Sequence, residues 1–148
     1  MKLSSTTAAR LAAAAGLLAV ALGAFGAHGL KNLLAHNGTT AIWEKAVFYH
    51  FIHALMLFLL AERKPFRALA WWSFLAGIVI FSGSLYLLAV TNARWLGAVT
   101  PVGGVCFLVG WTCLMLFQCS GERPLPISET HRGHESESPP NGPSASPF

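Results

Sequence analysis

Long apolar stretches separated by short polar segments fill the first 119 residues of the chain. Four stretches carry no charge: Leu11–Ala27, Ala46–Ala61, Ala68–Val90 and Trp95–Cys119. A bilayer's hydrocarbon core is roughly 30 Å thick and takes about 20 helical residues to cross, so each stretch spans it, the first two with a few flanking residues. The pattern predicts four membrane-spanning helices, at residues 8–28, 41–61, 68–90 and 96–119.

The polar segments between these stretches predict how the helices are connected. Glu62–Arg67 includes a proline, which cannot continue a helix, and Thr91–Arg94 is a second short turn. Gly29–Lys45 mixes polar residues with leucines and favours an interfacial connector, with Thr39 or Thr40 capping the next helix. Because short turns make neighbouring helices antiparallel, we expect an all-α integral membrane bundle of four antiparallel helices over residues 1–119.

The two ends of the chain differ from its middle. Residues 120–148 are rich in serine and proline, which is typical of a disordered tail. At the other end Lys2 and Arg10 precede an alanine-rich run, and Ala19–Ala21 resembles a signal-peptide cleavage site. The run continues to Ala27 with small residues at helical spacing, so we expect an uncleaved helix that packs closely on a neighbour.

Composition and charge agree with a membrane protein and suggest its orientation. Hydrophobic residues make up 54% of the chain and charged residues 11%, and the mean hydropathy is +0.54. Eight Lys or Arg and two Glu precede Ser120, a net charge of +6, which in a membrane protein orients the chain rather than marking a nucleic-acid partner. With both termini on one side, that side holds six basic residues up to the first arginine of the tail: Lys2, Arg10, Arg63, Lys64, Arg67 and Arg123. The other side holds Lys31, Lys45 and Arg94, so we expect cytoplasmic termini in a cell inner membrane and no nucleic-acid partner.

Polar side chains collect at one depth of the predicted bundle, in the outer half. They are His28, Tyr49, His50, His53, Ser82, Ser84, Tyr86 and Thr100. Because hydrocarbon offers no hydrogen-bond partners, we expect these groups to face inward and bond one another. Such a cluster either holds the helices together or binds a lipid or a membrane-protein partner.

The histidines allow a second interpretation. His50 and His53 lie on one helix face and, with His28, could present three nitrogens to a metal or haem. Hydrogen bonds to a neighbouring helix account for the same spacing, and no haem-attachment motif or short cysteine pair is present. The cysteines are Cys106, Cys113 and Cys119. We expect them to be reduced packing residues, and we expect no cofactor or metal, with the three histidines as weak candidates.

Small residues and a proline mark positions of close packing or of a helix break: Gly23, Gly26, Gly83, Pro101, Gly103 and Gly104. Pro101 either breaks a helix that lines a transport path or occupies the first turn of the last helix. Aromatic residues near the predicted interfaces look like membrane anchors: Trp43, Trp71, Trp72, Tyr86 and Trp95. Trp111 lies deeper.

Four sequence blocks carry a resemblance to a known family. They are GAFGAHGL at 23–30, AVFYHFIHAL at 46–55, FSGSLY at 81–86, and GAVTPVGG at 97–104 followed by Gly110 and Trp111. In this order they resemble the YgdD-type family of small bacterial inner-membrane proteins and its small eukaryotic four-helix relatives, over about residues 10–118. The resemblance implies a four-helix protein of the bacterial cytoplasmic membrane and, because the family is of unknown function, no particular reaction.

The sequence favours a non-enzymatic integral membrane protein. No paired carboxylates occur in the membrane part, and no intramembrane aspartate could orient His53 as the base for a serine nucleophile. One alternative is a small transporter or proton-linked permease that oligomerises through the small-residue stripe of the first helix. The other is a histidine-ligated metal or haem membrane protein.

Overall fold

The computed structural model describes residues 4–118, and within this range the chain forms helices and turns and no strand. The elements are α1 (Ser5–His28), α2 (Lys31–Asn37), α3 (Thr40–Glu62), α4 (Ala68–Gly77), the π-helix η1 (Ile78–Ser82), α5 (Gly83–Thr91), the 3₁₀-helix η2 (Arg94–Ala98) and α6 (Thr100–Gln118). Four segments are long and apolar enough to cross a membrane: Ser5–His28, Thr40–Glu62, Ala68–Thr91 and Arg94–Leu116. The predicted all-α membrane bundle is confirmed; the tail predicted at 120–148 lies outside the described residues.

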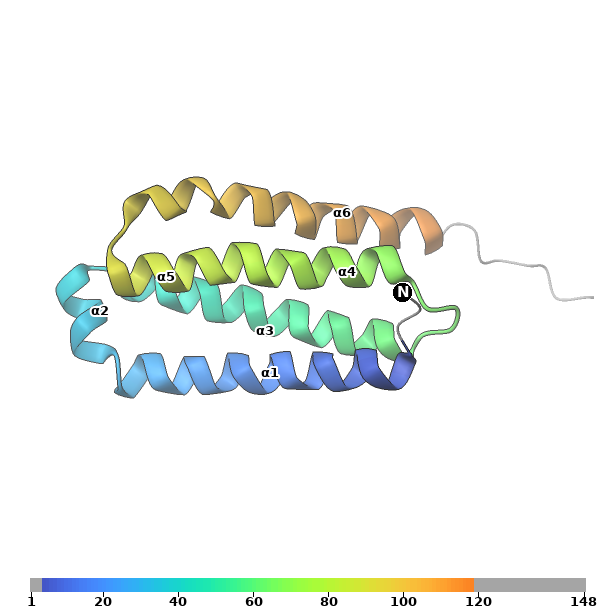
Figure 1. Ribbon diagram of the computed structural model, residues 1–148, viewed down its shortest axis with the longest axis horizontal. Coiled ribbons are helices and arrows are strands. Elements are labelled where there is room, and N and C mark those ends of the chain that lie inside the picture. Colours follow the sequence, from blue (N-terminus) through green and yellow to red (C-terminus); the bar gives the residue numbers. More distant parts are fainter. Residues whose placement is uncertain (1–3, 119–148) are drawn as a thin grey trace, which may run out of the picture.

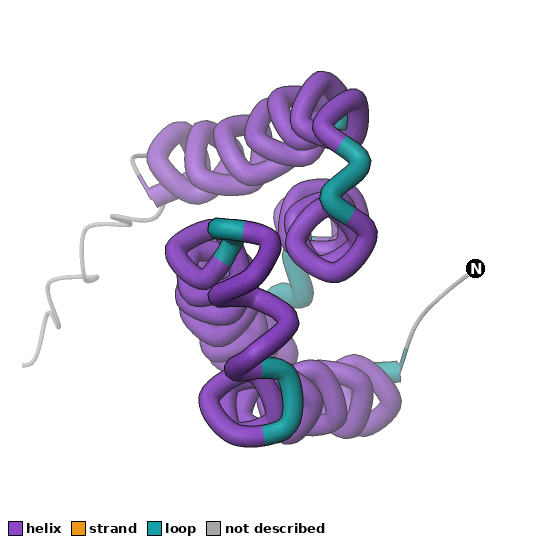
Figure 2. The backbone as a smooth tube through the Cα atoms, turned by 90° about the vertical axis from the view of Figure 1, so that its left-hand side faces the viewer, coloured by secondary structure: helices purple, strands orange, loops and turns teal. Residues whose placement is uncertain are grey.

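The four spans run antiparallel, with α2 at one end and both the start of α1 and the end of α6 at the other (Figure 1). Seen end-on they form a staggered row rather than a closed square (Figure 2). α1 packs on α3, α3 packs on the third span (α4, η1 and α5), and the third span packs on α6. The spans differ in the burial of their most apolar 18 residues. Of these residues, 17% are buried in α1 and 22% in the last span, whereas 39% and 44% are buried in the two inner spans. The two edge spans therefore present most of their surface to lipid.

The connector at the α2 end caps the third span. Gly38 ends α2 in the left-handed conformation (φ 66°) and turns the chain into α3. Thr39 Oγ1 then donates to the Ala89 carbonyl at 2.7 Å, and Asn37 Nδ2 lies 3.2 Å from the carbonyls of both Ala89 and Val90. The last carbonyls of a helix have no partner within it, so these side chains satisfy the end of α5. The prediction that Thr39 caps α3 is wrong, because Thr39 occupies the N-cap position but its side chain makes no capping hydrogen bond to that helix.

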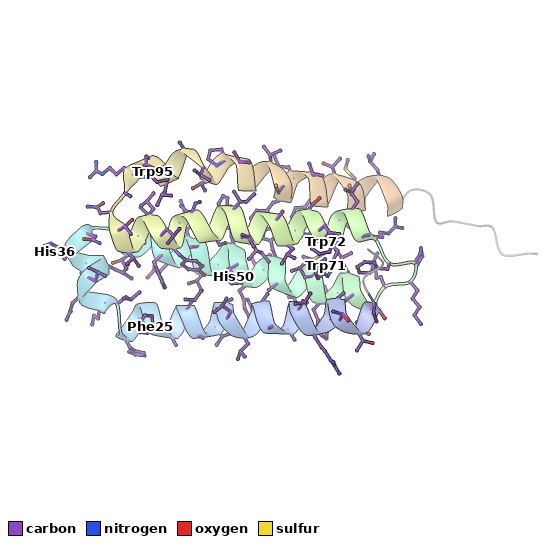
Figure 3. All side chains as sticks on the ribbon, in the orientation of Figure 1. Phe25, His36, His50, Trp71, Trp72 and Trp95 are labelled. Carbon is purple, nitrogen blue, oxygen red and sulfur yellow. The ribbon has the colours of Figure 1, made fainter. Side chains whose placement is uncertain are left out.

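Two of the predicted membrane anchors lie in the interior instead. Trp43 is 5% exposed and its indole N–H donates to the Leu22 carbonyl of α1 at 3.1 Å. Trp71 is fully buried and donates to the Leu57 carbonyl of α3 at 3.2 Å. An indole N–H in hydrocarbon needs an acceptor, and a neighbouring helix supplies it in both cases. The tryptophans that remain exposed near opposite ends of the molecule are Trp72 and Trp95 (Figure 3).

The last span contains no break at its proline. Pro101 lies in the first turn of α6, where a missing N–H costs nothing, and η2 precedes it. The irregular segment is η1 in the third span, where the Gly83 N–H bonds to the Ile78 carbonyl five residues earlier. Gly103 of α6 lies directly against this segment, because a Cβ at Gly103 would collide with the backbone of Phe81.

Other glycines receive aromatic rings from the facing helix. A Cβ at Gly77 of α4 would meet the ring of Phe107, and a Cβ at Gly110 of α6 would meet the ring of Phe74. Each of the two helices thus places one phenylalanine ring against a glycine of the other. Gly26 of α1 receives the Trp43 indole in the same way.

The remaining glycines named from the sequence are less constrained. A Cβ at Gly23 would lie 3.2 Å from Val47, which is a tight contact. At Gly104 its nearest neighbours are ring atoms of Phe81 at 3.9 Å, an ordinary contact, and at Gly83 nothing lies within 4 Å. Close packing therefore depends on Gly26 and Gly103 far more than on Gly83 or Gly104.

Gly103→Ala should destabilise the protein by about 1–3 kcal/mol, because the added methyl meets backbone that cannot rotate away. The matched control is Gly83→Ala, which adds the same methyl to open space and should be neutral or stabilising by up to about 1 kcal/mol through helix propensity. Thermal unfolding of the detergent-purified variants measures both. Equal unfolding temperatures for the two variants would contradict the close α6–η1 contact.

Candidate functional site

His53 lies at the centre of a layer of aromatic rings between α3 and α6. Its imidazole stacks on Phe107 with ring centroids 3.6 Å apart and planes 10° apart. Phe74 and Trp111 approach it at 5.5 and 6.3 Å, and Tyr49 at 6.0 Å. The side chain is 4% exposed. Three of the four spans thus contribute rings to the surroundings of one imidazole.

The hydrogen bonds of His53 fix its tautomer. Nδ1 lies 2.8 Å from the Tyr49 carbonyl, which can only accept, so Nδ1 carries the proton. The indole N–H of Trp111 lies 3.4 Å from Nε2 and can only donate, so Nε2 offers its lone pair. Protonating Nε2 would place two donors against each other, and a metal at Nε2 would have to displace Trp111. In this arrangement His53 is a neutral imidazole with one hydrogen bond at each ring nitrogen.

His50 faces a different neighbour. Its Nδ1 lies 3.4 Å from the Tyr86 hydroxyl of α5, and the Tyr86 ring meets Trp43 edge-on at 4.7 Å. Trp43 in turn bonds to the Leu22 carbonyl of α1. This second group links α1, α3 and α5, and Figure 3 shows His50 on the inner part of the helix row, between the two ends.

The hydroxyl residues form a third group. Ser84 Oγ lies 2.9 Å from Thr100 Oγ1 and 2.9 Å from the Phe81 carbonyl, to which it donates, which ties the third span to the start of α6. Thr100 also lies 3.4 Å from the Leu96 carbonyl. Ser82 in η1 is completely buried and its hydroxyl has no hydrogen-bond partner among the described residues.

The structure therefore divides the predicted polar cluster into separate groups. His50 and His53, although three residues apart, turn to α5 and α6 respectively. His28 belongs to none of the groups, because it is exposed at the end of α1 and makes no hydrogen bond or ring contact within residues 4–118. Within the same residues no three His, Cys, Asp or Glu side chains are placed to hold a metal, so the three-histidine arrangement is not formed.

A groove of about 830 Å³ lies between α1 and α3 and is bounded at one end by α2. α1 contributes mainly small residues to its lining, and α3 contributes mainly aromatic and aliphatic residues. The lining includes Ala27, Lys31, Thr40, Glu44, Phe48 and Ile52. Most of the lining is apolar, and its two charged residues are Lys31 at the start of α2 and Glu44 near the start of α3.

Small residues of α1 pack against α3. Ala8, Ala12, Ala19 and Gly26 are the buried residues of the helix. The larger apolar residues of α1 point outward, as Phe25 does in Figure 3. Of the small residues expected from the sequence to form a packing stripe on this helix, Ala19 is buried, whereas Ala27 is exposed and lines the groove.

Four apolar spans held together by buried indole, imidazole and hydroxyl bonds define a multi-pass integral membrane protein. Residues 22–104 match the family model described as "Protein of unknown function (DUF423)", so the chain belongs to this family, whose curated members are named UPF0382 membrane proteins.

Two relatives illustrate the similarity. The UPF0382 membrane protein YwdK of Bacillus subtilis is 45% identical over 112 residues, covering 72% of this chain and 90% of that protein. A UPF0382 membrane protein of Staphylococcus epidermidis is 44% identical over 110 residues, covering 72% and 89%. No solved structure matches the chain.

Several residues of the site were not expected from the sequence. Phe74, Phe107 and Trp111 surround His53, and Trp43 supports Tyr86 from the interior. The available signal was the seven-residue spacing of Gly103 and Gly110, which marks the face of α6 that approaches the third span.

We expect a double-mutant cycle between His53→Phe and Trp111→Phe to give a coupling of about 0.5–1.5 kcal/mol, typical of hydrogen bonds between membrane helices. Phenylalanine keeps an aromatic ring at each position and removes the bonding nitrogens, and the cycle subtracts the change in ring size at each site. Unfolding in detergent measures the cycle, and a parallel cycle of His53→Phe with Trp95→Phe, at an exposed site, should give no coupling. A coupling near zero in both cycles would contradict the Trp111–His53 bond.

His53→Ala should lower the accumulation and the detergent stability of the protein, because it leaves the Trp111 N–H without an acceptor and opens a cavity beside Phe107. His28→Ala should leave both unchanged, since that side chain is exposed. Membrane protein level and thermal unfolding compare the two variants. Equal loss in both would mean that His28 also belongs to the polar interior.

Proposed function

We propose that this protein is a non-enzymatic membrane protein that holds a membrane lipid in the groove between α1 and α3. The observation that carries the proposal is the groove itself. Its volume, about 830 Å³, lies within the roughly 300–1,000 Å³ of ordinary small-molecule sites, and its lining is almost wholly apolar.

The dimensions of the groove suit a lipid chain. Its α3 lining extends from Thr40 to Ile52, which at 1.5 Å per residue is about 18 Å. One leaflet contributes about half of the roughly 30 Å hydrocarbon core, so an acyl chain lying in the groove would reach from the α2 end to the middle of the bilayer. The groove faces the bilayer, from which a lipid can enter laterally.

The interior polar residues support a structural role rather than a catalytic or conducting one. Both nitrogens of His53 are engaged, and Ser84 and Thr100 bond each other. A proton relay or a metal site would need one of these partners to be displaced. The small-permease alternative also loses the helix break that supported it, since Pro101 opens α6.

We further propose that the termini are cytoplasmic, so that the α2 end and the mouth of the groove face outward. In support, the end of the molecule opposite α2 carries Arg10, Arg63, Lys64 and Arg67, and the α2 end carries Lys31, Lys45 and Arg94. A cytoplasmic (inner) membrane location agrees with the bacterial relatives. The resemblance of the four sequence blocks to the YgdD-type family and its eukaryotic relatives stays a prediction.

Ala27→Phe should reduce the lipid that stays bound through purification at least severalfold, because the ring occupies the groove that Ala27 lines. The control is Ala21→Phe, which adds the same ring to an exposed face of α1 outside the groove. Native mass spectrometry of both variants, released from detergent, counts bound phospholipid. Equal retention by the two variants, or no retained lipid in the unmodified protein, would overturn the proposal.

A further inference from the structure

The mouth of the groove carries one positive and one negative side chain. Lys31 is the first residue of α2, and Glu44 lies one turn into α3; both are exposed and both line the groove. Within residues 4–118 neither residue forms an ion pair, with the other or with any third residue. Two opposite charges therefore flank the same opening without neutralising each other.

We infer that the groove selects a zwitterionic phospholipid with a primary amine in its headgroup. The Lys31 ammonium takes the lipid phosphate, and the Glu44 carboxylate accepts hydrogen bonds from the lipid ammonium. The inference rests on the proposed lipid groove and adds the headgroup class.

Charge complementarity excludes the other common headgroups as preferred ligands. An anionic glycerol headgroup can pair its phosphate with Lys31. It carries a net negative charge, however, and presents hydroxyls rather than a cation to the Glu44 carboxylate. A choline headgroup has the right charges, but its quaternary nitrogen has no N–H to donate to a carboxylate. Of the three headgroups, a primary ammonium beside a phosphate is the one that offers charge-assisted hydrogen bonds to both side chains. Thr40 also lines the groove, one turn before Glu44 on α3, and its hydroxyl is a further hydrogen-bonding group for the headgroup.

The other charged residues at this end do not line the groove. Lys45 follows Glu44 on α3, and Arg94 lies in η2 beside the last span; neither belongs to the lining. The preference should therefore depend on Lys31 and Glu44 and be indifferent to Lys45, which makes Lys45→Gln the matched control.

The test is competition between phosphatidylethanolamine, phosphatidylcholine and phosphatidylglycerol of identical acyl chains, added in equal amounts to the purified full-length protein and read by native mass spectrometry. The unmodified protein should retain the ethanolamine lipid about two- to fivefold over each competitor, the range expected for exposed charge contacts. Glu44→Gln should lower the retained ethanolamine lipid to about the level of the choline lipid and so abolish that preference. Lys31→Gln should lower the retention of all three phosphate lipids, and Lys45→Gln should change neither.

The outcomes separate the two proposals. Lipid bound by the unmodified protein without any headgroup preference would overturn the selectivity and leave the groove as a lipid site. Lipid bound with a preference that Glu44→Gln does not alter would also overturn the assignment of Glu44. Retention that survives Ala27→Phe, or no retention at all, would overturn the lipid groove itself.

Discussion

The fold depends on indole N–H groups that find acceptors on neighbouring helices. Lipid offers no hydrogen-bond partner, and the apolar packing that holds a soluble core together gains little between helices already surrounded by hydrocarbon. Three tryptophans supply a directional contact instead: Trp43 to the Leu22 carbonyl, Trp71 to the Leu57 carbonyl and Trp111 to His53 Nε2. Each bond joins a different pair of spans, and α3 takes part in all three. The role of α3 as the central helix follows from these bonds, and the absence of a side chain at Gly26 lets one of the indoles approach closely enough to make its bond.

The staggered row leaves the edge helices with few protein neighbours. Among the spans α1 packs chiefly on α3, so its remaining surface faces lipid, and along the edge between the two helices the small residues of α1 fail to fill the space beside Phe48. In a closed bundle that space would be interior and filled. Here it is an open, apolar groove whose polar mouth is set by the short α2, the same segment that caps α5 through Asn37 and Thr39. This connector thus satisfies the last carbonyls of α5 and also places Lys31 at the opening of the groove.

The sequence was sufficient to predict the spans, because uncharged apolar stretches of about 20 residues are rare outside membranes, and Pro65 and Asn92 lie in the turns between them. It was insufficient to predict which helix each polar residue faces. Apolar residues surround a membrane helix on both its lipid and its protein sides, so the pattern hardly distinguishes an inward from an outward face; Trp43 and Trp71 were accordingly expected at the interface and lie inside. His50 and His53 share a helix face by spacing, yet about 60° of rotation between them, from the 3.6-residue turn, is enough to direct one to α5 and the other to α6. The π-helix at Ile78–Ser82 has no signature in the pattern at all.

A ligand binds most readily to polar side chains that do not already have hydrogen-bond or ion-pair partners within the protein. In the interior, the imidazole of His53 and the hydroxyls of Ser84 and Thr100 are bonded to protein, and the charged side chains lie at the helix ends or in the connectors. A ligand that engaged these three side chains would have to break bonds for which lipid provides no replacement. At the groove mouth the opposite holds, because Lys31 and Glu44 are exposed and without ion-pair partners within residues 4–118 and can gain contacts without losing any. The proposed lipid, apolar along the groove and bipolar at its end, would gain contacts at Lys31 and Glu44 without disturbing the interior hydrogen bonds.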